Sequence, residues 1–125
     1  MPSACEKHDA VRIDIRQVPL GPMPGFPHSI PRCVVNIRIP SGRRFTPKEL
    51  IEIAAEQRDR VLSFGKHYCA MAFHCWTPEQ KVGQEEAAAV IDYAPAGKWE
   101  DAMDAGIGEY ETHKFQMMSN LTKET

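Results

Sequence analysis

The sequence has no long apolar run and little net charge. No stretch approaches the roughly 20 apolar residues that a membrane-spanning helix needs, so we expect no membrane partner. Residues 6–9 are charged or polar where a secretory signal would be apolar, which predicts a cytoplasmic protein. Lys and Arg number 15 against 17 Asp and Glu, for a net charge of −2. This weak negative balance argues against a nucleic-acid partner.

Signatures of several enzyme classes are also missing. The chain has neither a Gly-x-x-x-x-Gly-Lys-Ser/Thr loop nor a Gly-x-Gly-x-x-Gly turn, the two motifs that cradle phosphates. A Gly-x-Ser-x-Gly nucleophile elbow and a His-Glu-x-x-His zinc helix are absent too. No Cys-x-x-Cys pair offers a zinc site. We therefore expect no metal and no cofactor, and the balance leans against an enzyme.

The four cysteines are predicted to be free thiols in the core. A cytoplasmic compartment keeps thiols reduced. Cys69 and Cys75 lie in what is predicted to be a single strand, where a rise of about 3.3 Å per residue separates them by about 20 Å. That separation is beyond the reach of a disulfide.

One segment contains a complete helix start. The Thr46 hydroxyl can accept from the N–H of Glu49, while the Glu49 carboxylate reaches back to the N–H of Thr46. Pro47 occupies the first helical position, where its missing N–H does no harm. The apolar spacing that follows predicts a helix over residues 47–64.

Alternating and β-branched residues predict strands, which span residues 11–16, 33–39, 67–76 and 87–93. In the first of them, Val11, Ile13 and Ile15 are expected to face the core.

The remaining segments are predicted to be loops, helices or loose ends. Residues 19–32 hold five prolines and are expected to form a loop. Residues 77–86 are predicted as a loop as well, although Thr77-Pro78 could also begin a helix. Beyond Trp99 the apolar spacing predicts one or two helices. The polar ends, residues 1–9 and 119–125, are expected to be flexible.

Together these elements predict an α+β fold. Residues 1–125 are expected to form a single two-layer domain, with an about four-stranded, mostly antiparallel sheet and one long helix packed on one face. The stretch from Cys33 to Tyr93, with its Thr-Pro-Lys-Glu-Leu helix start, resembles small strand–helix–strand–strand domains that have been catalogued without a function. The resemblance is structural, and it implies no functional residue.

The sheet face away from the long helix is the candidate functional surface. Even positions of the third predicted strand place two alanines between aromatic residues, which leaves room flanked by walls with polar groups. By the same alternation, polar residues of the second and fourth strands share this face. The candidate residues are Asn36, Arg38, Tyr68, Ala70, Ala72, His74, Trp76 and Asp92.

Three roles suit this face. The C-terminal helices could simply cover it as core. It could instead join two copies of the chain, making the protein a non-catalytic interaction module that acts as a homodimer. It could also bind a small anionic metabolite, with Arg38 holding the anion and His74 with Asp92 acting as an acid–base pair, as in a small enzyme. The sequence favours the non-catalytic module.

Overall fold

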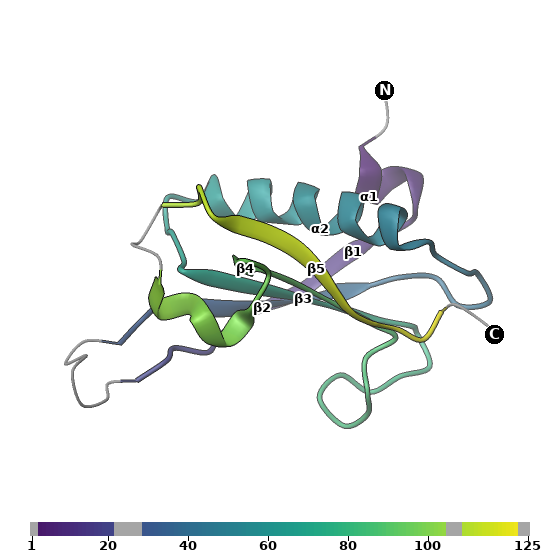
Figure 1. The fold of residues 1–125 in the computed structure, drawn as a ribbon. Helices are drawn as coiled ribbons and strands as arrows, with labels where there is room; N and C mark the ends of the chain where they lie inside the picture. Colours follow the sequence, from purple (N-terminus) through teal and green to yellow (C-terminus); the bar gives the residue numbers. More distant parts are fainter. Residues whose placement is uncertain (1–2, 22–28, 105–108, 123–125) are drawn as a thin grey trace.

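In the computed structural model, described for residues 3–21, 29–104 and 109–122, the chain forms a five-stranded sheet with one long helix on one face (Figure 1). Its elements in chain order are α1 (Ala4–Lys7), β1 (Val11–Gln17), β2 (Arg32–Arg38), α2 (Pro47–Leu62), β3 (Ala70–Trp76), β4 (Ala89–Pro95), the 3-10 helix η1 (Trp99–Asp104) and β5 (His113–Asn120). The predicted α+β class is confirmed, with five strands in place of about four.

The strands lie in the sheet in their chain order, β1-β2-β3-β4-β5. Only β2 and β3 are parallel among the pairs described, and α2 is the crossover that joins them. Figure 1 shows α2 along one face, while η1 and the segment 77–88 lie on the other side of the sheet. We call this second side the open face.

The helix begins as its sequence predicts. The Thr46 hydroxyl accepts from the Glu49 N–H at 3.2 Å, and the Glu49 carboxylate accepts from the Thr46 N–H at 2.9 Å. Pro47 is the first helical residue. Two amides that the helix itself cannot satisfy are thereby paired.

The main core lies between α2 and the sheet. Val35, Phe73 and Ile91 are register partners on three adjacent strands, and all are fully buried. Leu50 and Ile53 of α2 belong to the same buried cluster. Each such side chain stabilises the fold by about 1.5–3 kcal/mol when it is buried. A one-residue shift in strand register would turn these side chains to the other face of the sheet and lose most of this stabilisation.

The prediction of one or two helices beyond Trp99 is largely wrong. Only η1 is helical there among the described residues, and residues 113–120 form β5, which pairs antiparallel with β4. Phe115 and Met117 pack on the core while Lys114 and Gln116 are exposed, so burial alternates from one residue to the next as in a strand. The apolar residues of this segment also fit the spacing of a helix, which is why a helix was predicted. Residues 105–108 lie outside the described residues.

The buried face predicted for the first strand is also wrong in part. Val11 is 64% exposed and Ile13 40% exposed, and only Ile15 packs on the core. The cause is that β1 is an edge strand whose register with β2 shifts between Arg12 and Asp14. Such a bulge turns the side chains before it away from the face that the alternation assigns to them.

Parts of both ends, for which the sequence predicts flexibility, make contacts with the rest of the chain. Cys5 of α1 is buried, and its N–H donates to the Glu56 carboxylate at 3.1 Å. At the other end, the Asn120 side chain donates to the Phe45 carbonyl at 2.9 Å. Residues 1–2 and 123–125 lie outside the described part of the chain.

The structure describes one of the two predicted loops fully and the other in part. Segment 77–86 contains turns and no helix, as expected. In the Pro-rich segment, Leu20 and Ile30 pair through an isolated antiparallel bridge, and residues 22–28 between them lie outside the described residues.

Candidate functional site

The open face is covered at both ends. At one end η1 packs on it through small side chains, which allow a close approach. The cluster there comprises Cys69, Ala70, Ala94 and Ala102, with Ile30 and Trp99 against it. At the other end, residues 82–87 stand over the second, third and fourth strands. The middle of the face is left uncovered between these two covers.

A groove occupies this middle. It consists of two adjoining cavities of about 460 and 200 Å³ that share Val18, Val34 and His74. The larger one runs toward Trp76 and residues 82–87, and the smaller one runs toward Asp92 and Trp99. Valine and alanine side chains make its floor, which is therefore mainly apolar.

One wall of the groove is fixed by a hydrogen-bonded relay across three strands. The Trp76 indole N–H donates to the Asn36 side-chain oxygen at 2.9 Å, and the Asn36 amide nitrogen donates to Asp14 at 2.7 Å. Trp76 is only 3% exposed, so an unsatisfied indole N–H would be costly. The relay holds the ring of Trp76 in one orientation at the edge of the larger cavity.

Asp92 is the unusual polar group of the groove. Its side chain is 6% exposed and lines the smaller cavity. Within the described residues it has no hydrogen bond and no ion pair. Burial, assisted by the charge of Glu100, raises the pKa of Asp92 to about 6. The carboxyl group is therefore mostly ionised at pH 7 but uncompensated.

His74 lies on the floor next to Asp92. It pairs with Val90 and Asp92 pairs with Ala72, so the two polar side chains are diagonal neighbours on one face of the antiparallel pair. No hydrogen bond among the described residues joins them. Burial lowers the pKa of His74, so its imidazole is neutral at pH 7 and can accept a hydrogen bond.

The structure brings five of the eight predicted residues together in the groove. They are Asn36, Ala72, His74, Trp76 and Asp92.

Tyr68, Ala70 and Arg38 lie elsewhere. Tyr68 belongs to the core cluster under α2, where its hydroxyl accepts from Gln17 at 2.9 Å. The alternation fails there because β3 begins at Ala70 and not at residue 67. Ala70 is fully buried beside η1. Arg38 donates to the Pro78 carbonyl at 3.5 Å and lines neither cavity of the groove.

Sequence reasoning missed other parts of the groove. Val18 follows the end of β1, and Trp99 begins η1, which the apolar spacing assigns to a longer helix. Glu85 and Glu86 of the segment 77–88 line the larger cavity, as does Arg16 of β1. Nothing local in the sequence places these residues over the sheet.

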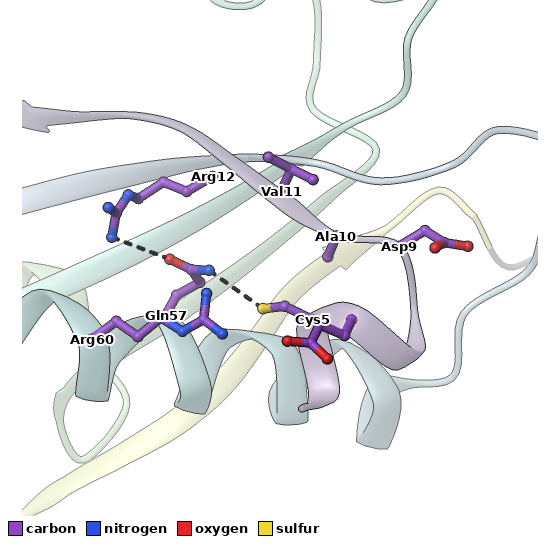
Figure 2. A pocket seen from close by; sticks show the side chains of 8 residues that line it. Cys5, Asp9, Ala10, Val11, Arg12, Gln57 and Arg60 are labelled. Atoms are coloured by element: carbon purple, nitrogen blue, oxygen red, sulfur yellow. Dashed lines mark hydrogen bonds between the residues drawn. The ribbon is translucent and has the colours of Figure 1, made fainter. Parts of the chain in front are cut away.

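A second cavity of about 520 Å³ lies between α1, β1 and α2 (Figure 2). Arg12 donates to the Gln57 side-chain oxygen at 3.5 Å, and the Gln57 amide nitrogen donates to the Cys5 sulfur at 3.3 Å. Burial raises the pKa of Cys5 to about 11, so the thiol is protonated at neutral pH and a poor nucleophile. These two hydrogen bonds connect β1 to α2 and α2 to α1.

In the part of the chain that the structure describes, no cluster of three or more His, Cys, Asp or Glu side chains is placed to hold a metal ion. None of the described helices has the length and apolar character needed to cross a lipid bilayer. Comparison of the chain with protein-family models, curated proteins and solved structures found no match in any of the three.

Proposed function

We propose that this protein is a small-molecule-binding domain whose site is the groove on the open face. The observation that carries the proposal is Asp92, a buried carboxyl group without a partner among the described residues, in the wall of an apolar cavity. Among the described residues, the fully enclosed side-chain atoms without a hydrogen bond belong to His8, Arg38 and His113. The Asp92 oxygens are not among them, so this carboxyl group is open to the cavity, where a ligand could reach it. The volume and the mixture of apolar floor and few polar groups are those of ligand pockets.

Binding without catalysis is the favoured form of this proposal. His74 and Asp92 share the groove, but no hydrogen bond links them into an acid–base pair among the residues described. The four thiols are all buried, which leaves the groove without a cysteine nucleophile. An acid–base enzyme using the same two side chains remains the alternative.

The proposal is tested by filling the groove. A fragment library screened by protein-observed NMR should shift the amide signals of Val34, His74 and Val90. Ala72→Leu should weaken binding by at least about tenfold, because the added methylene groups occupy the floor of the smaller cavity. Ala55→Leu on α2 makes the same change away from the groove and should leave binding unchanged. Binding that survives Ala72→Leu, or shifts that lie elsewhere, would contradict the proposal.

The second candidate function is the homodimeric interaction module. Exposed apolar side chains at the edge strand β1 favour it, namely Val11 and Ile13. A dimer formed through the open face should dissociate on Ala72→Arg, whereas one formed through β1 should dissociate on Ile13→Lys. The proposed location is the cytoplasm, which the four free thiols support.

A further inference from the structure

The charges around the groove are predominantly negative. Glu85 and Glu86 lie at the larger cavity, Asp92 at the smaller one, and Glu100 acts on Asp92 from η1. Arg16 is the one basic side chain among the described lining residues of the two cavities, and it already lies 3.8 Å from the Asp14 carboxylate. An anion entering the groove would meet net repulsion.

The neighbouring basic groups do not compensate Asp92. The guanidinium carbon of Arg32 lies 4.4 Å from the ring centroid of Trp99, where it makes a cation–π contact. Arg38 donates to the Pro78 carbonyl. Lys114 of β5 is exposed and makes no ion pair with Asp92 in the described structure.

The smaller cavity offers two hydrogen-bond acceptors at neutral pH, beside the one N–H donor of the neutral His74 imidazole. Asp92 presents an ionised carboxylate, and the neutral imidazole of His74 presents a ring nitrogen that can accept. Around them lie the apolar side chains of Val18, Val34 and Ala72. The complement of this arrangement is a cationic donor attached to an apolar body.

We propose that the groove selects an organic cation, a small amine whose ammonium group binds Asp92 and whose apolar part lies on the valine and alanine floor. The inference rests on the proposed function, because it names the class of ligand for the same site. It replaces the anionic metabolite that the sequence suggested, since Arg38 lies outside the groove.

Three probes with one ring and different head groups test the inference. Benzylamine, benzyl alcohol and benzoate are titrated separately against the protein at pH 7.5, with NMR shifts of the groove amides as the readout. We expect benzylamine to bind at least about tenfold more tightly than benzyl alcohol, because its ammonium forms a charge-assisted hydrogen bond. Benzoate should bind most weakly.

Two variants with the same change in charge complete the test. Asp92→Asn keeps the shape of the side chain and should abolish the preference for benzylamine over benzyl alcohol. Asp59→Asn removes an exposed carboxylate on α2 and should preserve it. Amide spectra establish that each variant is folded.

The outcomes separate this inference from the proposed function. If benzyl alcohol binds in the groove as well as benzylamine does, or if Asp92→Asn keeps the preference, the cation inference is wrong and the groove is still a binding site. If benzylamine causes no shift in the groove, the cation inference is wrong as well. The proposed function is overturned only by the fragment screen with Ala72→Leu and its control.

Discussion

Asp92 is a buried side chain in the candidate site whose ionisation lowers the stability of the fold. Its carboxyl group is buried without a partner in the described structure, whereas other buried polar groups, such as Asn36 and Gln57, have hydrogen bonds. A group whose pKa rises on folding stabilises the folded state most below its unfolded pKa. For Asp92 this contribution is lost as the pH rises from about 4 to about 6, so the ionised group opposes folding at neutral pH.

Asp92→Asn should therefore stabilise the protein at pH 7.5. We expect the free energy of unfolding to increase by on the order of 2 kcal/mol, because each tenfold weakening of an acid on folding corresponds to about 1.4 kcal/mol. At pH 4 the native carboxyl group is already protonated, and the variant should then match the natural sequence. Urea denaturation at the two pH values measures both differences. A gain of the same size at pH 4 would show that ionisation is not its cause.

A second prediction at the residue scale concerns the reactivity of the four thiols. Burial raises the pKa of Cys33 and of Cys75 to about 12, and it raises that of Cys69 as well. We expect iodoacetamide at pH 7.5 to modify none of the four cysteines in the folded protein and all four in urea. Mass spectrometry of the intact chain counts the adducts. Rapid labelling under native conditions would mean that a thiol is accessible.

At the scale of elements, α2 depends on its first turn. Thr46→Ala should lower the free energy of unfolding by about 1 kcal/mol, because the Glu49 N–H loses its acceptor. Ser63→Ala at the other end of the helix is the matched control, and it should cost less because that hydroxyl satisfies no amide. Chemical denaturation of both variants measures the difference, and equal losses would contradict a capping role.

The contribution of Glu49 to stability should decrease at acid pH. The hydrogen bond from the Thr46 N–H, opposed in part by desolvation, holds the pKa of Glu49 below its usual value. A depressed carboxyl pKa contributes stability that is present above the unfolded pKa and lost as the pH falls through the folded one. Glu49→Gln should therefore lose more stability at pH 7 than at pH 3.

Elements whose signals are local could be predicted, and those that depend on neighbours could not. The helix start is written in adjacent residues, and the structure reproduces it from Thr46 onward. The segment after Tyr110 has apolar residues at spacings that suit a helix or a strand. It forms a strand because it can pair along the edge of β4. The exposure of Val11 follows from the position of β1 at the sheet edge, which no local pattern records.

At the scale of the whole molecule, the sequence predicted part of the groove but not all of it. Alternation along β2, β3 and β4 predicted that Asn36, His74 and Asp92 would share a face. Its walls come from Trp99 and from the segment 77–88, which reach the open face only through the tertiary fold. The sequence thus predicted a surface, and the fold made it concave.

The occupied ends of the open face lead to a prediction about assembly. Because η1 and the segment 77–88 stand on this face, two copies cannot bring their sheets together as flat surfaces. We expect light scattering to give the mass of one chain, 14.1 kDa, at micromolar concentration. Twice that mass would favour the homodimer, and Ile13→Lys beside Ala72→Arg would then locate its interface.

The two tryptophans have a practical consequence. The chain contains only Trp76 and Trp99, and both line the groove, one in each cavity. The tryptophan fluorescence of the whole protein therefore originates at the candidate site. A bound molecule would displace solvent near one or both indoles and alter the intensity or wavelength of that light. The protein carries its own optical reporter of occupancy, and a titration needs no attached dye.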